Sequence, residues 1–166
     1  MSLFLIAAPV VPSATAEQQQ VDMEGGDAAS PYALLAATLK SNHPTMHDQD
    51  AIDLAAILDK AKSDPETTWL LRKMKEGSGK EHFDEFNKDM TALDIVRSMQ
   101  EAMNELKALD VLFRDPQRAV QEMIRDGLVP KDKISLYKKD PALLEDDFRK
   151  SLYFSLLSYA AAGGYL

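Results

Sequence analysis

The sequence predicts an all-α fold, a single-domain bundle of about four helices with short accessory helices. Three observations predict it. Good helix formers dominate the chain from Ser30 onward. Apolar residues return at steps of three and four, which is the spacing of one helical face. No stretch of five residues combines alternating polarity, β-branched side chains and flanking turn signals, as a strand would.

The first residues predict an export signal. The apolar run Leu3–Val11 is followed by Ala14-Thr15-Ala16, an arrangement typical of the end of such a signal. The run is shorter than the about 20 residues that cross a bilayer, and no Lys or Arg precedes it. We therefore interpret residues 1–16 as a partial export or targeting signal, the alternative being an apolar N-terminus. Residues 17–30 predict a flexible leader and residues 31–166 the helical bundle domain.

Four prolines mark helix starts, because each follows a residue whose side chain can cap the first turn. Proline at the first helical position loses nothing, since its missing N–H would have no partner there. The four pairs are Ser30-Pro31, Asp64-Pro65, Asp115-Pro116 and Asp140-Pro141.

The first half of the domain predicts three helices. The first spans about residues 31–40 and is stopped by His43-Pro44. The second begins near Asp48 or Asp50 and ends near residue 62. The third follows residue 64 and ends at residues 77–79. Its expected apolar face consists of Trp69, Leu70, Leu71 and Met74.

The longest segment without glycine or proline, residues 80–114, contains the expected central helix. Phe83 and Phe86 begin the segment, and Thr91 with Asp94 can cap a fresh start. From residue 91 to residue 113 a helix would be about 34 Å long. The pattern leaves open whether one helix or two cover residues 80–114. The expected buried stripe is Ile95, Met99, Met103, Leu106, Leu109 and Phe113.

Two further helices and a basic linker complete the chain. A short helix follows Pro116, and Gly127 with Leu128 behind it predicts a left-handed C-terminal cap. Residues 131–139 predict a basic linker that can include one helical turn. The last helix starts at Pro141 and ends at residues 163–164. Its uncharged end, from residue 151, is too short to predict a membrane span, so we expect a helix buried on most sides.

Charge and composition exclude several functions. The net charge is −8, and residues 17–66 hold ten acidic and three basic residues. This acidic excess argues against nucleic-acid binding, which depends on clustered Lys and Arg. There is no cysteine, which excludes disulfides, thiol nucleophiles and thiolate metal sites. No phosphate loop, nucleophile elbow or calcium loop occurs. We expect neither an enzyme nor a cofactor.

Histidines are the remaining candidates for chemistry. His43 and His47 are spaced by four residues, as two metal ligands on one helix would be. Pro44 makes a helix that includes His43 improbable, so a plain polar loop is favoured over a metal site. His82 lies among acidic residues without a nucleophile, which indicates a solvated side chain. Paired acids such as Asp146-Asp147 are explained by the positive N-terminal end of the last helix.

One basic patch predicts partner docking. An acidic partner could bind it, and the alternative is a solvated linker. The eight methionines allow an adaptable surface, although core filling explains them better. The residues of this expected docking patch are Lys131, Lys133, Tyr137, Lys138 and Lys139.

The layout resembles the helical lumenal proteins of photosynthetic thylakoids, the PsbQ-type extrinsic subunits of photosystem II and their relatives. The resemblance rests on the signal-like residues 1–16, the helix start at residues 90–94, and residues 137–154 before the Ala-rich end. It departs from many members in lacking a Pro-rich leader between residues 17 and 30. The resemblance implies a chloroplast protein of the thylakoid lumen that supports photosystem II without catalysis.

These observations rank three functions. We expect a non-enzymatic binding or scaffold protein that docks on a larger membrane complex, such as photosystem II in photosynthesis, and that reaches the membrane only through this partner. The alternative is a secreted, effector-like protein that interacts with other proteins. The third is a metal-binding protein or enzyme that uses His43 and His47.

Overall fold

The computed structural model describes residues 31–77, 84, 85 and 87–166, and this part of the chain contains α-helices and no strand. The all-α prediction is therefore confirmed. The chain divides into two compact units, Met1–Ala56 and Ile57–Leu166. The predicted signal, the predicted leader, Phe83, Phe86 and His82 lie outside the described residues.

The first unit contains α1 (Ala33–Asn42) and the beginning of α2 (Asp48–Lys62). α1 starts two residues after Pro31, with Tyr32 rather than a Ser side chain at its N-terminal boundary. It ends before His43, as predicted, and the His43 N–H donates to the carbonyl oxygen of Lys40. Lys40 also forms an ion pair with Asp48, which joins the end of α1 to the first turn of α2. The buried apolar residues of this unit are Ala36, Leu39, Met46, Ala51, Leu54 and Ala55.

α3 (Pro65–Glu76) begins as predicted, and its expected apolar face is confirmed only in part, because Leu71 is buried and Met74 half-buried whereas the other two residues are exposed. Asp64 accepts hydrogen bonds from the N–H and the hydroxyl group of Thr67. Thr67, at 1% exposure, and Leu71 lie on the buried side. Trp69 and Leu70, predicted to be apolar contacts, are 49% and 41% exposed. The reason is geometric: consecutive residues on a helix point about 100° apart, so the three consecutive residues Trp69, Leu70 and Leu71 cannot share one face.

α5 (Ala92–Leu112) is the predicted central helix. Its first residue shows that the segment 80–114 is interrupted just before residue 92. Thr91 Oγ1 accepts from the Asp94 N–H, while Asp94 Oδ2 accepts from the Thr91 N–H. This reciprocal capping box makes α5 a helix separate from the residues before it. The whole expected stripe is buried: Ile95, Met99, Met103, Leu106, Leu109 and Phe113.

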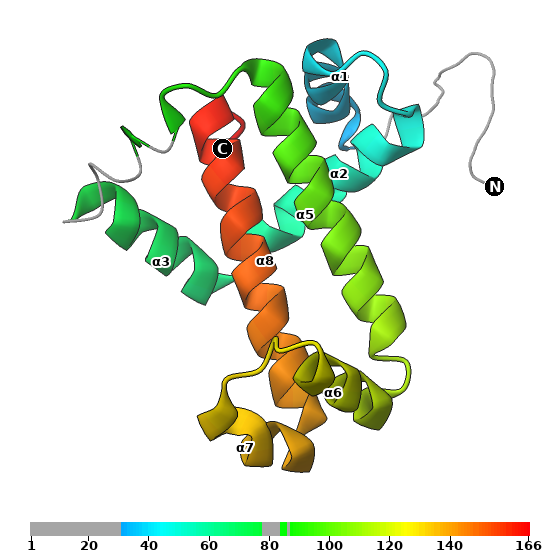
Figure 1. Ribbon diagram of the computed structural model, residues 1–166. Helices are drawn as coiled ribbons and strands as arrows, with labels where there is room; N and C mark the ends of the chain where they lie inside the picture. The colour runs from blue at the N-terminus through cyan, green and yellow to red at the C-terminus, as the bar shows by residue number, and fades with distance from the viewer. Residues whose placement is uncertain (1–30, 78–83, 86) are drawn as a thin grey trace. The chain divides into compact units, whose positions relative to one another are not determined.

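The second unit is organised around α5 and α8 (Pro141–Gly163), which run antiparallel and side by side (Figure 1). α3 packs along α8. α6 (Pro116–Arg125) and α7 (Ile134–Lys139) pack at the end where α5 stops and α8 starts. A core cluster joins α5, α6, α7 and α8. Its buried residues are Leu109, Phe113, Ala119, Val120, Met123, Val129, Tyr137 and Leu144.

The predicted cap of α6 is confirmed in detail. Gly127 has a positive φ of 74°, which glycine adopts without steric cost. The Leu128 N–H donates to the carbonyl oxygen of Met123 at 2.9 Å, and the Gly127 N–H donates to that of Ile124 at 3.1 Å. Together these bonds form a Schellman motif, which satisfies the last carbonyl groups of the helix.

The basic linker is more regular than expected, and the start of α8 differs from the prediction. Residues Lys131–Lys133 form a 3₁₀ helix, η2, which leads directly into α7. Pro141 opens α8, but the Asp140 side chain makes no capping hydrogen bond, so its predicted role as a cap is wrong. The backbone carbonyl of Asp140 instead accepts from the Leu143 N–H at 3.1 Å.

α8 is enclosed along its C-terminal half, as expected, because residues 152–162 are all buried or half-buried. Within the described residues, none of the helices has the length and apolar character needed to traverse a membrane. Seven α-helices and η2 lie in this part of the chain. The bundle of about four helices and the single domain at residues 31–166 remain predictions.

Candidate partner-binding surface

The predicted docking patch lies on η2 and α7, and the structure separates its members into two groups. All four lysines (Lys131, Lys133, Lys138 and Lys139) are exposed. Tyr137 is only 4% exposed and belongs to the core cluster. Its placement on the docking surface is therefore wrong, because α7 turns this side chain toward α8.

Tyr137 instead attaches α7 to α8. Its hydroxyl group donates a 2.6 Å hydrogen bond to Asp147 Oδ2. This hydrogen bond, together with burial and the charges of Asp147 and Asp132, raises the pKa of Tyr137 to about 12. The Tyr137 hydroxyl is thus a proton donor at neutral pH. The sequence predicted only a favourable charge near a helix end for Asp147. In the structure Asp147 accepts the hydrogen bond that attaches α7 to α8.

The sequence did not predict that Leu136 belongs to this surface. Leu136 is 47% exposed on α7, whereas the adjacent Tyr137 is buried. Lys133 and Lys139 lie three residues before and after it, about one helical turn away on either side. The exposure of Leu136 could have been inferred from helical geometry, because residues next to a buried residue on a short helix point to other sides of the helix.

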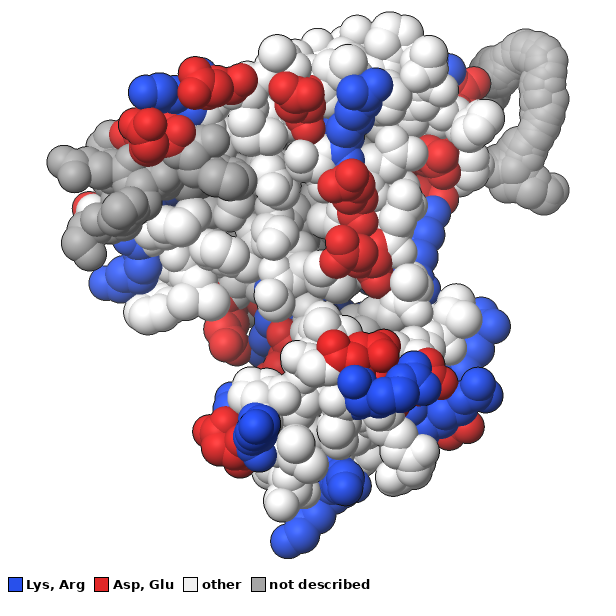
Figure 2. Space-filling model, in the orientation of Figure 1, with Lys and Arg blue, Asp and Glu red and all other residues white. Residues whose placement is uncertain are grey.

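We define the lysine surface as Leu136 with Lys131, Lys133, Lys138 and Lys139. Its net charge is positive. Among the described residues, none of these lysines forms an ion pair. Asp132 and Asp140 lie within the same stretch, so residues 131–140 carry a net charge of about +2. Figure 2 shows Lys and Arg side chains gathered over this end of the second unit, around α6 and α7.

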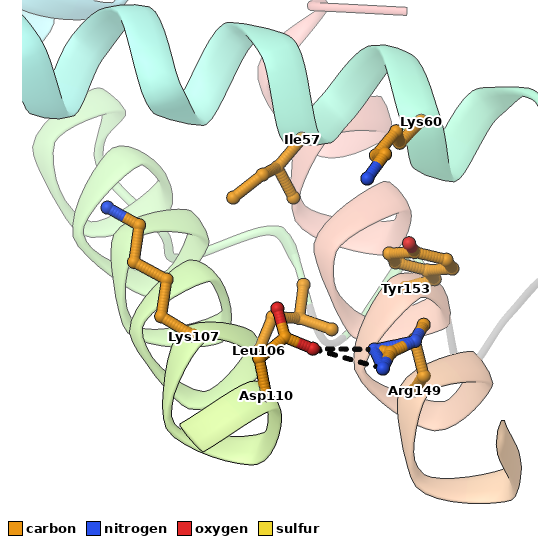
Figure 3. Close-up of a pocket in the computed structure, with 7 residues that line it drawn as sticks. All are labelled: Ile57, Lys60, Leu106, Lys107, Asp110, Arg149 and Tyr153. Carbon is orange, nitrogen blue, oxygen red and sulfur yellow. Dashed lines mark hydrogen bonds and ion pairs between the residues drawn. The ribbon is translucent and has the colours of Figure 1, made fainter. Parts of the chain in front are cut away.

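A small hollow of about 200 Å³ lies elsewhere in the second unit, between the C-terminal half of α2, α5 and α8 (Figure 3). Ile57 and Leu106 form apolar walls, and Lys60 and Tyr153 lie on the opposite side. Arg149 closes one end by donating from Nη1 and Nη2 to Asp110 Oδ1 at 3.2 and 3.0 Å.

The charge of Arg149 in this hollow is compensated, and Lys60 and Lys107 add two further cations to its lining. Arg149 Nη2 also donates to Glu145 Oε2 at 2.9 Å, so one guanidinium group serves two carboxylates. Burial raises the pKa of Tyr153, although the nearby Arg149 charge opposes this effect. The Arg149–Asp110 contact thus joins α8 to α5 beside this hollow.

A second hollow, of about 210 Å³, lies on the apolar surface between α5, α6 and α8. Leu112, Leu128 and Phe148 line it as an extension of the core cluster. Three acids line it. Glu122 and Asp126 are paired with Arg118 at 2.8 Å and Arg125 at 3.3 Å, whereas Glu105 forms no ion pair within the described residues.

The histidine pair does not form a recognisable centre. His43 follows the end of α1, and its Nδ1 lies 3.4 Å from Thr45 Oγ1. His47 is exposed just before α2. In the described residues, no group of three or more His, Asp or Glu side chains is placed to hold a metal ion.

Comparison with known proteins adds no relative: no protein-family model, curated protein or solved structure matches this chain.

Proposed function

We propose that the chain is a non-catalytic binding or scaffold protein that docks on a larger protein complex through its lysine surface. The observation that supports this proposal is the exposure of Leu136 between cations on a helix that is fixed in place. An exposed apolar side chain ringed by charge is the usual form of a small interaction site.

The physical chemistry of the surface favours an acidic protein partner. Lysine side chains without local ion pairs attract an acidic surface and accelerate association. Leu136 would add apolar contact area once water is displaced. The Tyr137–Asp147 hydrogen bond holds α7 before binding, so less ordering is required when the partner arrives.

We propose photosystem II in the thylakoid lumen as the first complex to test. The support is the resemblance in layout to PsbQ-type subunits, together with the signal-like pattern of residues 1–16. In this proposal the protein is exported to the lumen, uses no cofactor and reaches the complex by protein contacts.

Two measurements test the proposal. Fractionation of the source cells, followed by affinity purification of the chain, should recover photosystem II core subunits from the lumenal face of thylakoids. Recovery only from the surrounding medium would favour the secreted alternative. Recovery only as a free monomer would contradict a docking role.

Variants then test the surface itself. Lys138→Glu with Lys139→Glu should weaken binding to photosystem II membranes at least tenfold, because two attractions become repulsions. Leu136→Ser should weaken it without changing charge. The matched control is Lys60→Glu with Lys62→Glu on α2, two exposed lysines outside this surface, which changes the net charge equally and should retain binding. Equal loss in both double variants would show a general charge effect instead of a docking surface.

A further inference from the structure

Trp69 is the only tryptophan in the chain, and it lies on the solvent-facing side of α3. Trp69 is 49% exposed and the adjacent Leu70 is 41% exposed, although Thr67 and Leu71 on the same helix are buried. Large apolar side chains that are this exposed and adjacent require an explanation, because a monomer gains nothing by hydrating them.

The surroundings of Trp69 are cationic. Arg72, Lys73 and Lys75 are exposed, and none of them forms an ion pair within the described residues. Lys73 Nζ lies 5.6 Å from the centroid of the Trp69 ring. The cation thus lies over the aromatic face and places charge beside apolar surface.

Two acids lie on α3. Glu76 is exposed next to Lys75 and offsets one of these cations, whereas Glu66 does not cancel their charge. Glu66 Oε1 accepts from Lys150 Nζ of α8 at 2.6 Å, so its carboxylate is engaged with the body of the unit. The acidic excess of the chain lies largely in residues 17–66, before this surface. α3 therefore presents an exposed Trp and Leu with three cations and one exposed acid, a net charge of about +2, although the whole chain is acidic.

The outward side of α3 alone is too small for a stable protein interface, and unlike the lysine surface it carries a tryptophan, a side chain that favours the membrane interface. A stable protein interface needs about 800 Å² from each partner and about 20 residues a side. The 12 residues of α3 form a helix about 18 Å long, of which only one side faces outward. A membrane interface needs less, because tryptophan partitions to the headgroup level and each Lys or Arg near an anionic surface strengthens binding about fivefold.

We propose that the outward side of α3, defined by Trp69, Leu70, Arg72, Lys73 and Lys75, binds the surface of membranes that contain anionic lipids. The helix lies on the headgroups, with Trp69 and Leu70 inserted shallowly and the cations paired with lipid charges. The contact is independent of the lysine surface on α7, and it adds a direct lipid contact to a protein that docks on membrane complexes.

The fluorescence of Trp69 provides a direct test, since no other tryptophan contributes. The full chain is mixed with vesicles of phosphatidylcholine alone or with added phosphatidylglycerol. We expect the emission to shift to shorter wavelength, and the protein to sediment, only with phosphatidylglycerol. Added salt should weaken both effects, because it screens the attraction.

Matched variants assign the effect to α3. Arg72→Glu with Lys73→Glu should reduce vesicle binding at least tenfold. Lys138→Glu with Lys139→Glu, which carries the same charge change on α7, should bind as the parent chain does. Trp69→Phe, followed by sedimentation, should bind more weakly while its helicity in circular dichroism is unchanged.

Three results would overturn the proposal: no emission shift with anionic vesicles, equal loss of binding in the two double variants, or an emission shift with poly-glutamate but not with vesicles. The last result would assign the surface to an acidic protein instead.

Discussion

Tyr137 on α7 and Asp147 on α8 are joined by a 2.6 Å hydrogen bond in which the phenol donates to the carboxylate. The two residues are ten positions apart in the chain, with the turn at Pro141 between them. Because α7 has only 6 residues, it cannot hold its orientation by its own backbone bonds. The orientation of the lysine surface therefore depends on this contact.

Tyr137→Phe removes this hydrogen bond and keeps the buried ring. We expect the free energy of unfolding to fall by about 1.5–3 kcal/mol, the usual contribution of a hydrogen bond to a charged group. Urea denaturation followed by circular dichroism measures it. Leu136→Ala, at the neighbouring exposed position, should change stability by no more than about 0.5 kcal/mol. A Phe variant as stable as the parent would show that the contact is not needed.

The same pair predicts a loss of stability at alkaline pH. The pKa of Tyr137 is raised from 10.0 to about 12, so the folded protein holds the phenol proton more tightly than the unfolded chain does. Its contribution is therefore complete below pH 10 and is lost as pH rises toward 12. Over this window the parent should lose more stability than Tyr137→Phe. Parallel pH curves for the two proteins would contradict the prediction.

The two Asp-Pro helix starts at Asp64 and Asp140 should differ in their sensitivity to mutation. Asp64 caps α3, whereas the Asp140 side chain makes no cap bond. Asp64→Ala should cost about 1–2 kcal/mol, and it leaves the buried Thr67 hydroxyl without its acceptor. Asp140→Ala should cost less than about 0.5 kcal/mol. Equal losses in thermal denaturation would contradict this assignment.

Asp64 also gives a pH dependence of the opposite sign. Its pKa is lowered from 3.8, mainly by the hydrogen bond from the Thr67 hydroxyl and against the effect of burial, with smaller contributions from the Thr67 N–H and Lys150. The stabilisation is present above the ordinary pKa and is lost as pH falls below it. Asp64→Ala should therefore flatten the acid side of the stability curve.

Met99 and Leu70 test which apolar residues form the core. Met99 is fully buried on α5, while Leu70 is 41% exposed on α3. Met99→Ala should lower the unfolding free energy by about 2–5 kcal/mol, because it removes apolar burial and leaves a cavity. Leu70→Ala should stay within about 0.5 kcal/mol. A large cost for Leu70 in chemical denaturation would show that the outward side of α3 is packed.

Gly163, near the end of α8, should not tolerate a side chain. A Cβ there would lie 2.6 Å from a ring atom of Tyr165 and 2.9 Å from Ile95 Cγ2. Gly163→Ala should therefore destabilise by about 1 kcal/mol, because the Tyr165 ring must move and the buried Ile95 must shift. The calorimetric transition should move to lower temperature. A stability gain would show that helix propensity outweighs the contact.

Local signals determine much of this fold, so the sequence predicts it well. The Thr91–Asp94 box and the Gly127 cap are each specified within a few residues, and the structure contains both. The α5 stripe is predictable because its buried residues recur through the full 21-residue helix.

Long-range contacts determine what the sequence does not predict. Tyr137 reads as a surface residue among lysines, and only the position of Asp147 on another helix shows why it is buried. α3 packs along α8, and there Thr67 and Leu71 are buried whereas Trp69 faces outward. The apolar character of a residue alone cannot predict whether its side chain is buried, because it does not show which side of a helix packs against another helix.

Arg149 and Lys150 are consecutive on α8, yet Arg149 bonds to Asp110 of α5 and Lys150 bonds to Glu66 of α3. Consecutive helical residues diverge by about 100° around the axis. One step of sequence on α8 thus sets the angular separation between its two neighbours. Inserting a single residue between this pair would rotate one attachment relative to the other, so the spacing of α3 and α5 around α8 should be intolerant of insertions there, although both side chains lie near the surface.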